Sequence, residues 1–257
     1  MNLIEVLIPL FVLAFVSEYV AATLGMGYGT TLAPILLIFG YEPLVLVPVI
    51  LFSQLFAGFI AAGFHHKFQN IDVRDEKQQK AIGIFIITGV SGVIISTLVG
   101  ISIPSLLVKL YIACIVIIVG LLTLINGFEE GTYSIKRITG VGVVAAFNKG
   151  LSGGGYGPIV IAGQMISGLG PRAAVAITAL VEGVICAVGV LMYILLAAPV
   201  DMILLIGITA GAIAAAPLSA FTTAKLKQEQ LRVAIAVSIV LIGVVALISV
   251  LLTSNVV

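Results

Sequence analysis

Residues 153–158 read Gly-Gly-Gly-Tyr-Gly-Pro, and residues 25–29 read Gly-Met-Gly-Tyr-Gly. Each stretch interrupts a long apolar segment, and glycine destabilises a helix interior while giving the backbone extra freedom. A shift of 128 positions aligns the two stretches and the residues after them, placing Gly25 on Gly153, Gly27 on Gly155, Tyr28 on Tyr156, Gly29 on Gly157 and Pro43 on Pro171. Hydrophobic segments broken by glycine at matching positions in two halves are typical of transporters built from repeats, which bind their ligand at the breaks.

The composition places the chain in lipid. Of its 257 residues 61% are hydrophobic and 9% are charged, whereas a soluble domain carries about a quarter charged residues. The two cysteines both lie inside apolar stretches, so we expect no disulfide or metal framework. We also expect no cofactor, no metal ion and no nucleic-acid partner.

Apolar windows bounded by glycine, proline and charged residues predict the helices. Long windows lie at 43–63, 81–100, 104–125, 172–196, 201–222 and 231–253, and the two breaks are flanked by 3–24 with 30–39 and by 138–150 with 158–168. A membrane crossing needs about 20 residues, so the arms of the second break are too short to cross alone. Each broken pair therefore either crosses as one kinked helix or enters and returns as a re-entrant hairpin.

Lysine and arginine discriminate between these two plans, because both residues concentrate on cytoplasmic loops. One net crossing per broken pair would divide them between the two sides of the membrane. Two re-entrant hairpins with an outer N-terminus would place ten of them inside: Lys67, Arg74, Lys77, Lys80, Lys136, Arg137, Arg172, Lys225, Lys227 and Arg232. We therefore expect cytoplasmic loops at 64–80, 126–137 and 223–230 and extracytoplasmic termini. Whether segment 3–24 crosses fully stays open.

The expected fold is an all-α polytopic membrane protein made of two repeats, 1–125 and 126–257. Each repeat would contain a re-entrant (broken) helical hairpin and three transmembrane helices. Because three crossings is an odd number, the second repeat would be inverted relative to the first, as in many secondary transporters.

The two hairpin tips predict an anion site. Helices that begin inside the membrane present unpaired N–H groups and partial positive charge, and glycine lets a ligand approach the backbone. The candidate substrate-binding residues at the tips are Gly25, Gly27, Tyr28, Gly29, Thr30, Thr31, Asn148, Lys149, Ser152, Gly153, Gly154, Gly155, Tyr156 and Gly157. Two alternatives remain: the glycines serve only close helix packing, and Lys149 extends to the cytoplasmic surface instead of attracting an anion.

The helices after each hairpin carry a second matched pair, because the same shift places Gln54 on Glu182. Gln54 and the nearby Thr178 are further candidate substrate-binding residues. Glu182 is a carboxylate deep in an apolar segment, where an isolated charge is costly. We expect Glu182 to be a proton-coupling group or a protonated hydrogen-bond donor to the substrate, and the alternative is a neutral acid bonded to hairpin backbone. Glu18 has no counterpart in the second half and ranks lower.

The chain resembles the TauE/SafE family, also called the sulfite exporter or toluene-sulfonate uptake permease family. The resemblance rests on Gly25-x-Gly27-x-Gly29 and on the run from Asn148 to Pro158, and it extends over essentially the whole chain. In the first motif Met26 and Tyr28 stand where glycine is typical of the family. The resemblance implies secondary transport of small sulfur-containing or organic anions, such as sulfite, sulfonates or sulfoacetate, across the plasma membrane, with proton coupling or drive by the anion gradient.

The main alternative function is a passive anion channel. An intramembrane serine protease is a second one, because Gly150-Leu151-Ser152-Gly153 is similar to the Gly-x-Ser-Gly of rhomboid proteases. That chemistry needs a base beside the serine, and both histidines lie in the 64–80 loop, so we expect no enzyme. The expected partners are a small anion and the lipid bilayer, and a homo-oligomer stays open.

Overall fold

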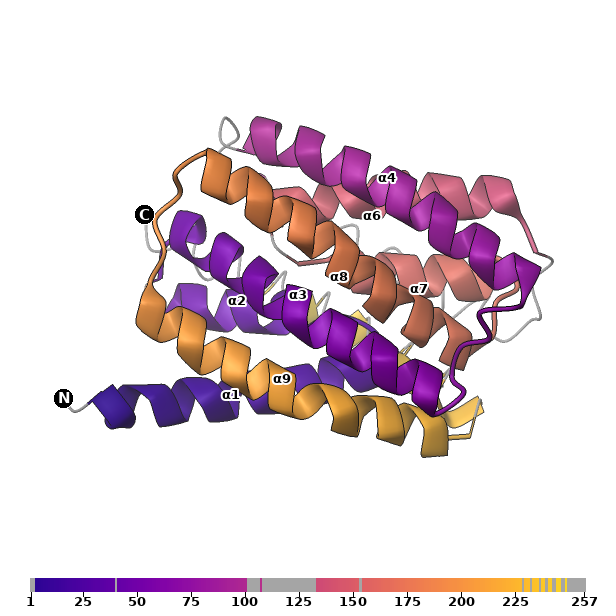
Figure 1. Ribbon diagram of the computed structural model, residues 1–257, viewed down its shortest axis with the longest axis horizontal. Coiled ribbons are helices and arrows are strands. Elements are labelled where there is room, and N and C mark those ends of the chain that lie inside the picture. The colour runs from indigo at the N-terminus through magenta and orange to yellow at the C-terminus, as the bar shows by residue number, and fades with distance from the viewer. Residues whose placement is uncertain are drawn as a thin grey trace.

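The computed structural model is helical throughout the part of the chain that it describes. The described residues are 3–39, 41–100, 107, 133–152, 154–227, 229–231, 233–235, 237–238, 240–241, 244–245 and 248. The elements are α1 (Leu3–Thr23), α2 (Gly29–Ile38), α3 (Pro43–Lys67), α4 (Glu76–Gly100), α6 (Ile135–Ser152), α7 (Tyr156–Ile166), α8 (Pro171–Leu195) and α9 (Met202–Lys225) (Figure 1). The expected helix at 104–125 lies, apart from Leu107, outside the described residues, and so does much of 231–253.

Five of the described helices are long and apolar enough to cross a membrane: α1, α3, α4, α8 and α9. Helices α3 and α8 each have 25 residues, which at 1.5 Å per residue exceeds the hydrocarbon thickness of about 30 Å. Both begin with a proline, Pro43 and Pro171, whose missing N–H would have no partner in the first turn anyway. Asp201 caps the N-terminus of α9, because its carboxylate accepts from the backbone N–H groups of Ile203 and Leu204 at 2.9 and 3.0 Å.

Two helices are longer than their predicted apolar windows, because they continue through charged residues. Helix α6 begins at Ile135 and has 18 residues. Its first turn is not part of the predicted window, because it carries Lys136 and Arg137 and so lies outside any apolar window. Helix α3 likewise continues through His65 to Lys67. His65 is fully buried and packs beside Asn70, whose side chain lies 2.8 Å from the imidazole Nδ1.

Helix α1 and helix α9 pack side by side and run in the same direction. Gly207 lies against Leu10, Gly211 lies against the backbone of Phe11, and the hydroxyls of Tyr19 and Thr222 are 3.0 Å apart. Small residues at such contacts let helices approach closely in lipid, where no hydrophobic force drives them together.

Helices α4 and α6 form a second parallel pair of the same kind. Gly142 lies against Thr88, Gly92 against Ala146, and Gly150 against Ser96. Each of the two pairs joins a helix of the first half to a helix of the second half.

At the centre, α3 packs against α8 and the two helices run in opposite directions. Leu51 lies against Gly189, and Gly58 lies against Gly183. Figure 1 shows α3 and α8 side by side, with α1 and α9 below them and α4 and α6 above. Exchanging α1 with α6, α3 with α8 and α4 with α9 therefore leaves the packing pattern unchanged.

The short helices α2 and α7 run back against the helices that precede them. Helix α2 is joined to the start of α3 through residues 39–42, and α7 to the start of α8 through residues 167–170. Helix α3 also runs parallel to α9, because Ser53 bonds to the carbonyl of Ile208 and Asn70, just after α3, bonds to that of Ala220. Since α1 and α3 therefore run in the same direction, α2 returns towards the side on which α1 begins.

Helix α4 runs parallel to α8 as well as to α6, because Gly89 lies against Ile185 and Val93 against Gly189. Helix α7 therefore returns towards the side on which α6 begins.

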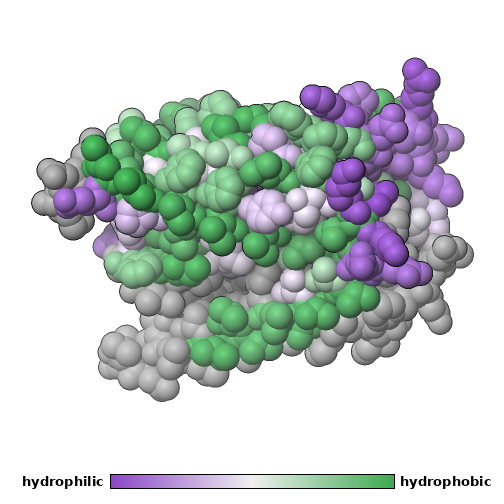
Figure 2. All heavy atoms as spheres, turned by 90° about the horizontal axis from the view of Figure 1, so that it is seen from below, coloured by the Kyte–Doolittle hydropathy of each residue, from purple (hydrophilic) through white to green (hydrophobic). Residues whose placement is uncertain are grey.

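The surface separates into a long apolar flank and a polar end. Figure 2 shows green, hydrophobic atoms along most of the length and purple, hydrophilic atoms gathered mainly at one end. The strongly exposed apolar side chains of the molecule include Ile87 (69% exposed) and Ile194 (66%), which fits contact with lipid tails. The polar end contains the α3–α4 connection, and there the hydroxyl of Tyr133 donates to the carbonyl of Lys77 at 2.9 Å.

Candidate functional site

The two glycine breaks meet inside the molecule. A Cβ on Gly157, at the start of α7, would lie 2.4 Å from the carbonyl carbon and oxygen of Met26. A Cβ on Gly25 would lie 2.1 Å from Ile161. Gly25, Gly27 and Gly155 also have positive φ values of 68°, 60° and 73°, a backbone region that side chains disfavour. The glycines are therefore required both by the local backbone and by the contact between the breaks.

A buried ion pair lies beside this contact. Lys149, in the last turn of α6, places its Nζ 2.5 Å from the Glu182 carboxylate of α8 and 2.5 Å from Oε1 of Gln54 on α3. Lys149 is completely buried and Glu182 nearly so. The thiol of Cys186 lies 3.9 Å from the same Gln54 oxygen. The sequence context suggested an isolated carboxylate, but Glu182 is paired with Lys149. Lys149, for its part, does not extend to the surface.

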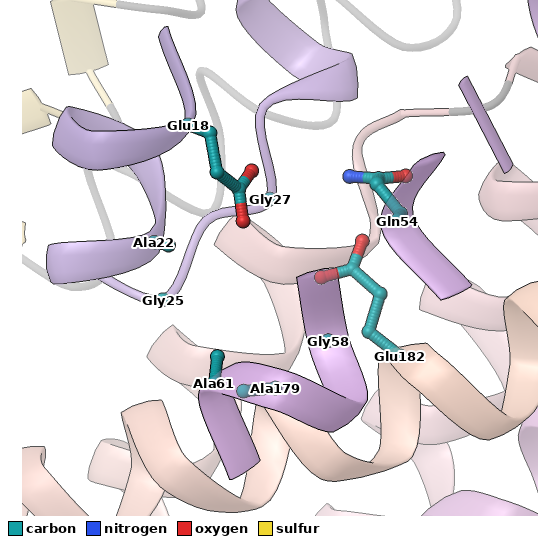
Figure 3. Close-up of a pocket in the computed structure, with 9 residues that line it drawn as sticks. All are labelled: Glu18, Ala22, Gly25, Gly27, Gln54, Gly58, Ala61, Ala179 and Glu182. Atoms are coloured by element: carbon teal, nitrogen blue, oxygen red, sulfur yellow. The ribbon is translucent and has the colours of Figure 1, made fainter. Parts of the chain in front are cut away.

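The ion pair borders a small cavity. It is lined by Glu18, Ala22, Gly25, Gly27, Gln54, Gly58, Ala61, Ala179 and Glu182 (Figure 3). The space available to the centre of a water-sized molecule is about 20 Å³, and one water needs about 10–15 Å³ by that measure. The cavity therefore has three polar side chains, Glu18, Gln54 and Glu182, in an otherwise apolar lining, and room for only about one water-sized group in this conformation.

Two helices begin at this centre. Helix α2 starts at Gly29, two residues after the cavity residue Gly27, and α7 starts at Tyr156 beside the Gly157–Met26 contact. A helix N-terminus carries partial positive charge. Together with Lys149, these two ends give the region a positive potential that the nearby carboxylates oppose.

The predicted site residues divide into those that line the cavity and those that support it. Gly25, Gly27, Gln54 and Glu182 line the cavity, and Lys149 contacts two of its walls. The hydroxyl of Tyr28 donates to Ser53, and the hydroxyl of Thr31 donates to the Tyr28 carbonyl at 3.0 Å. Both bonds support the first break.

The remaining predicted residues lie near the second break or in the adjoining helices. Asn148, Gly154, Gly155, Tyr156 and Gly157 are buried there. Thr178 accepts a hydrogen bond from Gln164 at 2.9 Å and donates to the Ala174 carbonyl at 2.8 Å, so it joins α7 to α8 instead of lining the cavity. Gly153 and the side chains of Thr30 and Ser152 lie outside the described residues.

Glu18, which ranked below Glu182 as a candidate from the sequence, also lines the cavity. It lies on α1, is 4% exposed, and accepts a hydrogen bond from the backbone of Tyr28. The sequence signal for Glu18 is a carboxylate within an apolar segment. Glu18 was not selected, because it has no counterpart in the second half. Ser53 directly precedes Gln54, and nothing in its apolar sequence surroundings indicates the bond from Tyr28.

Comparison with known proteins identifies the family. The sequence model for "Sulfite exporter TauE/SafE" matches residues 10–246 of this chain. The chain belongs to the TauE/SafE sulfite exporter family. It is therefore a multi-pass membrane transporter, which confirms the predicted class of protein. The family is a transporter family and not an enzyme family, which confirms the second prediction.

This TauE/SafE transporter is also similar to a bacterial protein. It is 26% identical over 255 residues to "Probable membrane transporter protein YtnM" of Bacillus subtilis (strain 168), covering 93% of this chain and 83% of that protein. No solved structure matches the chain.

Proposed function

We propose that this protein is a secondary transporter that moves small sulfur-containing or organic anions, of the sulfite, sulfonate or sulfoacetate type, across the plasma membrane with proton coupling. The observation that carries the proposal is the contact of buried Lys149 with Glu182 and Gln54 at the meeting of the two glycine breaks. The substrate would be held between the two hairpin tips, near the membrane midplane.

The ion pair supplies a direct reason for coupling. Lys149 is neutralised by Glu182 at 2.5 Å, so an arriving anion competes with this carboxylate for the ammonium group. Protonation of Glu182 removes the competitor and leaves the lysine charge for the substrate. The negative charge that binds at Lys149 is then matched by the proton on Glu182, which avoids leaving an uncompensated charge beside this pair in the low-dielectric interior.

The backbone around the pair would contribute the rest of the anion site. The N-terminus of α2 follows Gly27, and the N-terminus of α7 touches Met26. Such ends attract anions through partial positive charge. The glycines would permit close approach once the tips separate enough to admit a substrate larger than water.

The proposed membrane plan is two inverted repeats, 1–125 and 126–257, each with one re-entrant hairpin and three crossings. Support comes from the packing pattern, which is unchanged when helices of one half are exchanged for those of the other, and from the antiparallel run of α3 and α8. A two-fold axis within the membrane plane gives this relation, whereas an axis along the membrane normal would make α3 and α8 parallel. Alternating access would arise from movement of one repeat against the other.

The polar end favours one orientation. Lys67, Lys77, Lys136 and Lys225 belong to the last turn of α3, the first turn of α4, the first turn of α6 and the last turn of α9. Because lysine concentrates on the inner side, we assign loops 64–80, 126–137 and 223–230 to the cytoplasm and both termini to the outside.

The test is uptake of sulfite, methanesulfonate and sulfoacetate into proteoliposomes with an imposed pH gradient. A proton-coupled carrier accumulates at least one of these anions above equilibrium, with saturation, while Glu182→Gln loses the response to pH. Glu76→Gln is the matched control, because Glu76 is an exposed carboxylate paired with Lys80 at the polar end. Uptake that only dissipates a gradient would instead indicate a passive channel, and transport restricted to cations or neutral solutes would refute the anion site.

A further inference from the structure

We propose that Glu18 is a second proton-binding carboxyl group of the transport cavity, distinct from Glu182 of the Lys149–Glu182 pair, and that in its acid form it donates a hydrogen bond to the bound anion. This inference rests on the proposed anion transport. It assigns a role to a residue that no sequence comparison of the two halves selects, because position 146, its repeat counterpart, is alanine.

The first support is the position of Glu18 in the cavity. It extends from α1 into the space that Glu182 enters from α8 (Figure 3). It is 4% exposed, and its Oε2 has no hydrogen-bond partner among the described residues. Glu18 also has no cation in contact within the described part of the chain, since the buried lysine at this centre is bonded to Glu182 and Gln54.

The second support is an independent donor on another wall. Gln54 uses its oxygen to accept from Lys149, while its Nε2, also buried, has no partner within the described residues. In Figure 3 the amide nitrogen of Gln54 lies on the side of Glu18. A buried donor without a partner is costly, so this nitrogen indicates that an acceptor atom belongs in the cavity.

The two observations define one ligand atom. An ionised Glu18 offers only acceptors and would repel an anion, whereas the acid form carries an O–H donor. An anion oxygen placed in the cavity could then accept from Gln54 Nε2 and from Glu18 Oε2–H together. When Glu18 is protonated and the anion is bound, Gln54 Nε2 and Glu18 Oε2 both have a hydrogen-bond partner.

Neighbouring groups make the two carboxyls different. The titratable groups facing Glu18 are Glu182 and Cys186 from α8, Lys149 from α6, and Tyr28 between α1 and α2. Helix α3 contributes Gln54, which does not titrate. The lysine charge is already matched by Glu182. In this proposal Glu18 and Glu182 each bind a proton, so that a transporter loaded with one monovalent anion holds two protons.

The primary test needs no substrate. Dicyclohexylcarbodiimide reacts with protonated carboxyl groups in apolar sites, and peptide mass spectrometry locates the adduct. We expect labelling at Glu18 that declines as the pH rises, with little at Glu182 while Lys149 holds it. Lys149→Gln should make Glu182 reactive, which shows that the reagent reaches the cavity. If Glu182 reacts in that variant while Glu18 stays unlabelled at all pH values, the proposal is wrong.

A second test measures charge movement with methanesulfonate, a monovalent sulfonate, as the probe. Two protons per anion make transport by the wild-type protein electrogenic, so a potassium–valinomycin potential alters its uptake. Glu18→Gln should lose this sensitivity, while Glu5→Gln, on the same helix, should keep it. If Glu18→Gln retains the wild-type response, Glu18 carries no transported proton. Labelling of Glu18 without transport of any tested anion would instead refute the proposed function.

Discussion

The two glycine breaks share a backbone plan but differ in the polar groups around them. Beside the second break Lys149 stands where the first half has Ala21, and Glu182 stands where it has Gln54. Beside the first break Glu18 stands where the second half has Ala146. The two breaks thus bring two helix ends together, while single charges at positions that do not correspond under the shift of 128 complete one asymmetric centre. A symmetric centre would place two like charges in contact, which low-dielectric surroundings penalise heavily.

The largest expected effect comes from removing the buried cation of the Lys149–Glu182 pair. Lys149→Met, which gives α6 an apolar residue like Ala21 of α1, leaves Glu182 without its partner. Breaking a buried ion pair in this way costs about 3–5 kcal/mol. We expect a large fall in the melting temperature in detergent and loss of anion uptake.

Two controls sharpen this prediction. Lys80→Met removes a lysine whose distance to its glutamate is also 2.5 Å but which is half exposed, so it should leave the melting temperature nearly unchanged. The double variant Lys149→Met with Glu182→Gln should recover much of the stability without recovering uptake. Equal melting temperatures for the single and double variants would contradict the pairing.

An intermediate effect is expected where the breaks touch. Gly157→Ala would place a Cβ 2.4 Å from the Met26 backbone, which cannot rotate away as a side chain would. Overpacking of this kind costs about 1–3 kcal/mol, and uptake should fall because the tips are forced apart. The matched control is Gly140→Ala in α6, where a Cβ meets nothing within 4 Å. A Gly157→Ala protein that melts and transports like the control would show that the contact is dispensable.

The smallest expected effect on stability concerns the hydroxyl groups of Tyr28 and Tyr156. Tyr28 donates to Ser53, whereas Tyr156 has Val181 at the corresponding position, and its hydroxyl has no hydrogen-bond partner among the described residues. Ser53→Val should cost about 1 kcal/mol, the net value of a hydrogen bond. Val181→Ser, the reverse exchange, should cost less because it offers Tyr156 a partner. A larger loss of melting temperature for Val181→Ser would show that the two environments differ by more than this hydroxyl.

Much of the architecture could be predicted from local sequence. The predicted windows at 3–24 and 172–196 differ from α1 and α8 by at most one residue at either end, because glycine and proline mark their limits. The start of α6 was missed by three residues, since a charged first turn leaves no apolar signal. The contact between Gly157 and Met26 could not be read from spacing, which places residues along a helix but does not orient one helix against another.

The sequence by itself determined the family, the membrane-embedded helical character and the positions of the two breaks, because composition and glycine placement act through local backbone energetics. Only the tertiary structure decided which polar groups share one cavity. Lys149, Gln54 and Glu182 come from three helices, and Glu18 from a fourth. A buried charge is compensated by whatever packing brings within about 3 Å of it, and that distance exists only after the helices have assembled.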